Sequence, residues 1–354
     1  MKKSVIGRLG GVALSIIVCV LLNLNGCSRH YIDSTQRHWL INFQQYSTVP
    51  ASADTTQSVP QLFGGEVSTQ LSGRLQAPRL GELSGLAVSR HNSELYWAIN
   101  DSGNRPLLFA LDRTGLSHGA TRLPFSNHDW EALAAFEDGG KRWLLIADTG
   151  DNLRRRETHS LYIIEEPELH SERNIRLHRK IEFSYEDGPQ NIESVAVSVA
   201  ERAIYLVSKN AASPTLYALP LDLAQTGTGK LAVNSIAGTL PIAKVVGQMQ
   251  PLPFTEDDRL IEQVLAGRFL LGPTSMDINA PESLAVVANY RHAYLYRRAP
   301  GQSWPQALMQ KPLAITSHRL AQSESVAFGL EDNTLLVGSE GMHSPLLLVE
   351  GDSP

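Results

Sequence analysis

Acidic residues stand at both ends of two apolar runs in the stretch DWEALAAFEDGGKRWLLIADTGDN, residues 129–152. Asp129 and Glu131 flank the start of the first run, and Asp148 and Asp151 follow the second. A Glu-Asp-Gly-Gly turn separates the two runs, which is typical of a hairpin of buried strands. The spacing therefore predicts carboxylates gathered at one end of a sheet, where they could bind a hard cation or transfer protons.

The same order of elements recurs along the chain. Each segment has a leading acid or Thr, a short apolar run, a polar turn, a second apolar run and a polar cluster. A third apolar run usually follows the cluster, and a fourth is less regular, with one candidate at 234–242. Helical periodicity is nearly absent, apart from a short helix expected at 258–266. The leading residues of the five segments are Glu82, Glu131, Glu193, Thr274 and Glu324. Because such self-similarity is the signature of a repeat architecture, we expect the leading residues at equivalent positions of the fold.

Short strands, closely spaced turns and a unit of about 50 residues predict an all-β fold, a β-propeller. Five blades are the favoured count. The interval between the third and fourth leading residues is the longest, and it either holds an insertion at 244–271 or conceals a sixth blade. A β-sandwich would also give alternating strands, but it would not repeat this order of elements.

In a propeller, the first strand of each blade lines the central channel, so the leading acids are expected at one mouth of that channel. Converging carboxylates repel one another unless positive charge lies among them. One solution is Ca²⁺ or another divalent cation, for which the candidate ligands are Glu82, Glu131, Glu193, Glu324, Asp129 and Asp148. The other solution is that protein donors, such as backbone N–H groups, Lys209 or Arg291, bind the Glu side chains and lock blade to blade. The sequence leaves both open.

Whether the protein is an enzyme also stays open, with a binding module favoured. A metal-dependent hydrolase of phosphoesters or lactones needs a base beside the cation, and the candidates are Asp101, Asp129 and Asp148. A binding module would use the acidic mouth for a small-molecule ligand or an envelope protein, whereas an assembly scaffold would use the blade edges. The pentapeptide GLSHG at 115–119 fits the nucleophile-elbow pattern, but it lies between two expected strands, which favours a hairpin turn.

The first 26 residues are expected to be an export signal. A basic start precedes an apolar run over 9–22 that is short for a membrane span. The following Leu-Asn-Gly-Cys resembles the bacterial lipoprotein signal, which implies cleavage after residues 1–26 and lipidation of Cys27. The resemblance further implies that Ser28 directs the protein to the outer membrane of a Gram-negative cell, held there by the lipid.

Two further segments follow from composition. Residues 27–72 contain the lipidated Cys and a stretch rich in Ser, Thr, Ala and Pro, which predicts a flexible tether. Residues 73–351 are predicted to form the β-propeller domain. The chain has two Cys, and Cys19 belongs to the signal, so the exported form has a single thiol and no internal disulfide.

The charge balance argues against a nucleic-acid partner. The chain has 31 Lys and Arg against 36 Asp and Glu, a net charge of −5. Cleavage of the signal removes three basic residues and no acid, which leaves 28 against 36 and a net charge of −8. Nucleic-acid binding requires clustered positive charge. The one basic triplet, at 154–156, is expected to be a solvated turn.

Several motifs resemble a group of secreted bacterial β-propellers that are classed as phytase-like or esterase-like. They are ELSGLAVS with WAINDSGN, DWEALA with IADTGDN, the EEP at 165–167, and YEDGPQNIESVAV with YLVSKN. The resemblance spans residues 73–350 and implies the propeller fold more than an activity. Gluconolactonase and paraoxonase propellers are similar only in placing Glu, Asn and Asp around a channel Ca²⁺, so their catalytic residues are not carried over.

Overall fold

The computed structural model describes residues 67–169, 175–222, 240–253, 272–318, 320, 322–330 and 334–351. The signal, Cys27 and most of the predicted tether lie outside these residues. Within them the predicted apolar runs form strands, and the first two strands of a repeat are buried along almost their whole length. This burial explains why their sequences are continuously apolar, because neighbouring sheets cover both of their faces.

Three sheets have four strands each. The first contains β2 (Leu83–Val88), β3 (Leu95–Asn100), β4 (Leu107–Asp112) and β5 (Ser117–Arg122). The second contains β14 (Ser275–Ile278), β15 (Leu284–Ala288), β16 (His292–Arg297) and β17 (Leu313–Ser317), with the short helix α4 (Trp304–Leu308) before its last strand. The third contains β18 (Ser323–Phe328), β19 (Thr334–Ser339), β20 (Pro345–Gly351) and β1 (Val67–Arg74).

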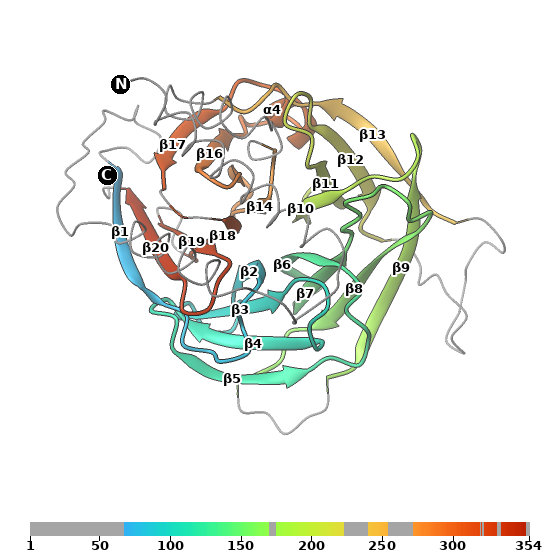
Figure 1. Ribbon diagram of the computed structural model, residues 1–354. Coiled ribbons are helices and arrows are strands. Elements are labelled where there is room, and N and C mark those ends of the chain that lie inside the picture. Colours follow the sequence, from blue (N-terminus) through green and yellow to red (C-terminus); the bar gives the residue numbers. More distant parts are fainter. Residues whose placement is uncertain are drawn as a thin grey trace, which may run out of the picture.

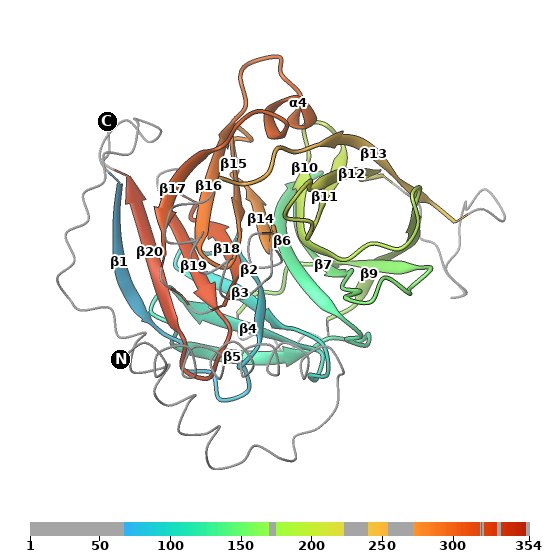
Figure 2. The ribbon, with the colours of Figure 1, turned by 45° about the horizontal axis from the view of Figure 1, so that its top comes forward.

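The remaining sheet has eight strands in the order β10-β11-β12-β13-β9-β8-β7-β6. It divides into two antiparallel halves. The first half contains β6 (Trp130–Asp138), β7 (Lys141–Asp148), β8 (His159–Glu165) and β9 (Leu177–Tyr185). The second contains β10 (Ile192–Ser198), β11 (Ala203–Ser208), β12 (Thr215–Pro220) and β13 (Ile242–Gln248). The halves join where β13 runs parallel to β9 over two residue pairs (Figure 2).

The innermost strands form a ring. β2 contacts β6, β6 contacts β10, β10 contacts β14, β14 contacts β18, and β18 returns to β2. Figure 1 shows these strands around a common centre, with the later strands of each unit farther out. The structure therefore confirms the predicted all-β class and has the arrangement of a β-propeller-like fold. The pentapeptide at 115–119 lies in the β4–β5 hairpin, as expected, since Ser117 begins β5.

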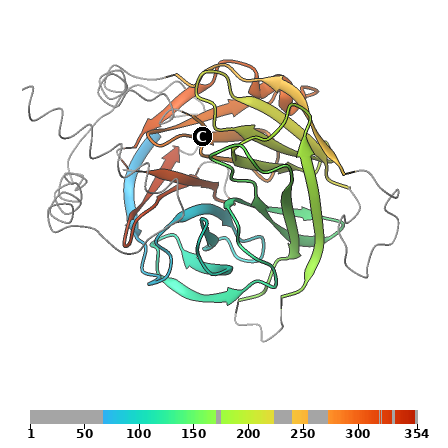
Figure 3. The same ribbon diagram turned by 45° about the vertical axis from the view of Figure 1, so that its right-hand side comes forward.

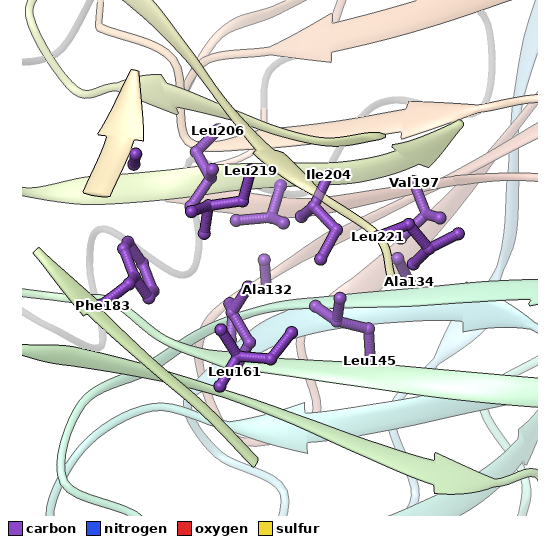
Figure 4. Packing of buried hydrophobic residues seen from close by; sticks show 14 of the residues in the cluster. Ala132, Ala134, Leu145, Leu161, Phe183, Val197, Ile204, Leu206, Leu219 and Leu221 are labelled. Carbon is purple, nitrogen blue, oxygen red and sulfur yellow. The ribbon is translucent and has the colours of Figure 1, made fainter. Parts of the chain in front are cut away.

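Apolar side chains fill the space between successive units. Leu145 and Leu161 of β7 and β8 pack in one cluster with Ile204, Leu206 and Leu219 of β11 and β12 (Figure 4). Each fully buried side chain of this size contributes about 1.5–3 kcal/mol of hydrophobic free energy. Face-to-face packing of this kind holds the first strands in the ring, and with them the residues at the start of each first strand.

The N-terminal strand closes the ring. β1 pairs antiparallel with β20 from Val67↔Gly351 to Arg74↔Pro345, and Figure 3 shows it in blue beside the red C-terminal strands. The predicted domain boundary at residue 73 is therefore wrong, because residues 67–72 belong to a strand and not to the tether. The boundary was hidden because VSTQLSGR has few apolar residues, and none of its residues at 68–74 is buried.

The predicted insertion at 244–271 also begins in the wrong place. Residues up to Gln248 belong to β13, which is the fourth strand of its half-sheet. A fourth strand was expected at 234–242, and it shares only Ile242 with β13. The short helix expected at 258–266 lies outside the described residues.

Candidate functional site

A β-bulge stands at the start of most first strands. The register shifts by one residue between the first and second pairs of β2–β3, β6–β7, β10–β11 and β18–β19. The extra residues in these bulges are Ser84, Glu131, Glu193 and Glu324. A bulge leaves its extra residue unpaired and re-aims its side chain. Three of the four leading Glu residues thus occupy one equivalent position in the ring.

Glu82 does not share that position. It lies two residues before the bulge, where the second unit has Asp129, and the bulge of the first unit holds Ser84. The Ser84 Oγ donates to the Trp130 carbonyl oxygen at 2.8 Å, so it ties the first unit to the next. Glu82 itself is exposed and accepts a hydrogen bond from Asn104. The sequence alignment of Glu82 with Glu131 is therefore wrong by two residues.

A second ring position lies one or two residues after the second strand in four of the units. The amides of Asp101, Gly150, Lys209 and Glu340 each donate to the carbonyl two residues before a bulge position, at 2.9–3.1 Å. This shared bond brings the residue after the second strand beside the bulge residue of the same unit. The third unit thus pairs Glu193 with Lys209, whereas the second unit pairs Glu131 with a glycine.

Three carboxylates converge between the first two units. Oxygen atoms of Asp101, Asp129 and Glu131 all lie within 4.8 Å of one another. Glu131 is 5% exposed, while Asp101 and Asp129 are partly exposed, so the group opens toward solvent on one side. Gly150 is required here because a Cβ would lie 2.3 Å from Glu131 Oε1 and 2.5 Å from Asp129 Oδ2. We call Asp101, Asp129 and Glu131 the acidic triad.

The acidic triad is electrostatically unfavourable without a cation. Burial raises the pKa of Glu131 well above its ordinary value, and the charges of Asp101 and Glu193 raise it further. Burial likewise raises the pKa of Asp101, to which Glu324 and Asp129 add. Among the described residues, no hydrogen-bond donor reaches the Glu131 carboxylate. Buried charges in proteins are normally paired or bound to a metal. The Glu131 carboxylate has no such partner, whereas Asp129 bonds the Ser102 side chain and Asp101 and lies in the field of Arg156.

The opposite side of the mouth has its own cation. Lys209 Nζ lies 2.6 Å from Glu193 Oε2 and donates to the Tyr290 hydroxyl at 2.8 Å. The Tyr290 hydroxyl donates in turn to Glu324 Oε1 at 2.8 Å. Burial raises the pKa of Glu193 to about 7, although Lys209 opposes the rise. Glu193 and Glu324 are therefore held by protein donors, as the second of the two sequence interpretations proposed.

Glu340 completes this side of the mouth. Gln322 Nε2 donates to Glu340 Oε2 at 2.6 Å and to Glu324 Oε1 at 3.3 Å. Burial raises the pKa of Glu340 well above its ordinary value, and its bond to the nearby Glu324 carboxylate adds to the rise. A protonated Glu340 that bonds Glu324 therefore accounts for two acids lying side by side without a cation between them.

Asp148 lies outside the acidic triad. It is fully buried, and its Oδ1 accepts from Arg156 at 2.7 Å. Its Oδ2 accepts from the His128 backbone amide at 3.2 Å and lies 3.3 Å from His128 Nδ1. A carboxylate that is paired with a guanidinium and a backbone donor is not free to bind a metal ion. Of the six predicted ligands, Glu131 and Asp129 come together, joined by Asp101 from the catalytic candidates.

Sequence reasoning missed three contributors. Arg156 was assigned to a solvated turn, but its guanidinium bonds Asp148 and the Gly150 carbonyl and so fixes the loop beneath the triad. Gly150 carried no signal beyond belonging to a polar turn. Tyr290 reaches Lys209 from a strand connection 81 residues away, which no local pattern reveals. Trp130, which lies between Asp129 and Glu131 in the sequence, is fully buried and packs against Phe125.

The triad has the chemistry of a hard-cation site. Its donors are all carboxylate oxygens, which suit Ca²⁺ or Mg²⁺, whereas a structural zinc site uses Cys and His. Ca²⁺ takes six to eight oxygen ligands in flexible geometry. Three carboxylates on one side would therefore leave coordination positions open toward the solvent.

Comparisons with known proteins do not assign the chain to a family. A scan against protein-family models finds no match, and a search of curated proteins finds none. In the part of the chain that the structure describes, no helix has the length and apolar character needed to cross a membrane.

Proposed function

We propose that the protein is a five-bladed β-propeller that binds one divalent cation, best matched by Ca²⁺, at the acidic triad. The five innermost strands in cyclic contact support the blade count, since the eight-stranded sheet separates into two blades at its two-residue join. The cation proposal depends on one observation. Glu131 is buried beside Asp101 and Asp129, and no donor among the described residues reaches its carboxylate.

The biological role that we favour is a binding module of the cell envelope. The cation would stabilise the mouth and offer open coordination positions to a small-molecule ligand or an envelope protein. We infer the lipid anchor at Cys27 and the outer-membrane location from the sequence of residues 1–28. The net negative charge of the chain supports the proposal that nucleic acid is not a partner.

One observation favours a hydrolase as the second candidate. His128 directly precedes Asp129 in the sequence. The His128 side chain is 69% exposed, and its Nδ1 atom lies 3.3 Å from Asp148 Oδ2. An imidazole oriented in this way could accept a proton from water at the triad. If so, the purified protein should hydrolyse lactone or phosphoester substrates in a Ca²⁺-dependent manner, and His128→Ala should abolish the activity while leaving cation binding unchanged. The absence of such activity would leave the binding module as the function.

The cation proposal is tested by metal content and thermal unfolding. We expect one Ca²⁺ per chain and a higher Tm in Ca²⁺ than in chelator. Glu131→Gln should remove both the bound ion and the Ca²⁺-dependent rise in Tm. The matched control is Glu137→Gln, an acid on the same strand with a side chain that is 58% exposed, and it should retain both. Equal Tm values for the native protein in Ca²⁺ and in chelator would contradict the proposal.

A further inference from the structure

We propose that Lys209 is a built-in cation that takes the place of a second metal ion, so that the mouth accepts a single external divalent cation. The inference rests on the proposed cation site at the acidic triad. Beyond that site, it states how many divalent ions the mouth binds and which residue determines this number. Two groups of carboxylates face the mouth, the triad on one side and Glu193 with Glu324 on the other. In the second group Lys209 contacts a carboxylate directly, whereas Arg156, the cation nearest the triad, acts on Asp129 while its guanidinium bonds Asp148.

The surroundings of the Lys209 ammonium resemble those of a bound ion. Its Nζ lies 2.6 Å from a carboxylate oxygen of Glu193, 2.8 Å from the Tyr290 hydroxyl oxygen and 4.7 Å from the centre of the Tyr290 ring. The side chain is 13% exposed. The Tyr290 hydroxyl in turn donates a hydrogen bond to Glu324. The Lys209 ammonium is therefore paired directly with Glu193 and linked to Glu324 through the Tyr290 hydroxyl.

The lysine is not required by the fold at this position. The equivalent residues of other blades, which make the same backbone bond, are Asp101, Gly150 and Glu340. Where the position holds glycine, beside Glu131, the bulge acid is left without a donor among the described residues. Where it holds lysine, the bulge acid is paired. For Glu131 and Glu193, the residue at this ring position thus decides whether the bulge acid has a protein cation beside it; Glu324 is held by Tyr290 and Gln322 instead.

The two halves of the mouth are electrostatically coupled. Burial by itself lowers the pKa of Lys209, but Glu193, Tyr290, Glu324 and Glu131 together raise it well above its ordinary value. Lys209 therefore stays charged at neutral pH and interacts with Glu131 of the triad. Its positive charge repels a second divalent ion and also weakens the first to some extent. A centre with two metal ions about 3.5–4 Å apart, as in many phosphoryl-transfer enzymes, is excluded by this arrangement.

Ion counting on the full chain, purified in detergent, tests the inference. Native mass spectrometry and calorimetric titration with CaCl₂ should give one Ca²⁺ for the native protein. Lys209→Met should give two, because Glu193 and Glu324 would then face the mouth without a cation. Lys209→Arg keeps the positive charge and should give one. The double variant Glu131→Gln/Lys209→Met should give one, which would show that the second ion does not lie at the triad.

The outcomes separate the two proposals. A native protein that binds no ion overturns the proposed cation site and, with it, the role of Lys209. A native protein that binds one ion, together with a Lys209→Met variant that also binds one, overturns the role of Lys209 and leaves the triad site intact. Two ions in the native protein, or two in Lys209→Arg, overturn it as well. Lys209→Gln repeats the test if the Met variant does not fold. If neither folds, the count for Lys209→Arg decides, because two ions in that variant overturn the inference and one supports it.

Discussion

Residues at one ring position behave differently because their neighbours differ. Glu131 and Glu193 both occupy a bulge, yet Glu131 faces Gly150 and two further acids, while Glu193 faces Lys209. A bulge fixes the direction of a side chain. Whether a carboxylate at that position stabilises the fold depends on the group that faces the carboxylate. Residue identity at the following ring position therefore separates a structural acid from a candidate ligand.

Glu193→Gln is expected to destabilise the protein equally in Ca²⁺ and in chelator. The substitution leaves the buried Lys209 ammonium without its carboxylate, which should cost about 3 kcal/mol. Glu131→Gln should instead lower the free energy of unfolding only in Ca²⁺. Chemical unfolding in both media measures the free energy of unfolding, with Glu137→Gln as the control. A Glu193→Gln effect confined to Ca²⁺ would place Glu193 among the ligands and contradict the assignment.

The sequence predicted Glu131 and Asp129 as ligands because apolar runs of strand length fix where a buried strand begins. It could not separate Glu82 from Ser84, because a bulge shifts the register by one residue without changing the local pattern. It could not pair Lys209 with Tyr290 either, since that contact joins two blades. Local chemistry was thus predictable, whereas contacts between blades were not.

Elements are joined by acids that reach from one blade to the next. Glu166 follows β8 and accepts from Trp97 Nε1 at 2.7 Å, from the Arg90 amide at 3.0 Å and from the Ser89 hydroxyl. Glu282 makes the same kind of clamp on Ser198 and the two following amides. The Glu166 clamp accounts for the second Glu of the EEP motif at 165–167, which the sequence did not explain.

Glu166→Gln should lower the free energy of unfolding by about 2–3 kcal/mol, because an amide cannot accept from all three donors and leaves buried groups unpaired. The neighbour Glu165 offers a matched control. Its side chain is 61% exposed and pairs with Lys141 at 3.3 Å, so Glu165→Gln should cost less than about 1 kcal/mol. Urea unfolding of both variants measures the difference. Similar losses in the two variants would show that Glu166 is not a clamp.

The closing strand is an element whose removal should affect the whole ring. Without β1, the β20 edge loses its partner from Val67↔Gly351 to Arg74↔Pro345. A chain that starts at residue 75 should lose at least about 10 °C in Tm relative to one that starts at residue 66, because several kcal/mol are lost in a domain of this size. A peptide of residues 66–75 should restore part of the loss by adding back the strand. Equal Tm values for the two chains would mean that β20 needs no partner.

The whole molecule brings more acids to one axis than its own cations neutralise. Apolar packing between blades positions the first strands, and the first strands place the acidic triad, Glu193 and Glu324 around one channel. The overall all-β arrangement was predictable from the repeated order of apolar runs. The imbalance of charge was not, because it depends on which acids find donors after the ring has closed. This imbalance should make the stability of the whole ring depend on pH and on Ca²⁺.

In chelator, the free energy of unfolding should fall as the pH rises from about 5 toward 8. Burial raises the pKa of Asp101 and Glu131, and that of Glu193 to about 7, so the folded state retains protons that the unfolded chain has already released. Stability from such groups is complete below their ordinary pKa values near 4 and is lost as the pH rises through the folded values. Ca²⁺ should largely remove the fall, because it stabilises the ionised triad. Tm values across this pH range in Ca²⁺ and in chelator measure the effect, and Glu131→Gln should flatten the chelator curve. A flat chelator curve for the native protein would show that the acids impose no such cost, and parallel falling curves would show that Ca²⁺ does not stabilise the ionised triad.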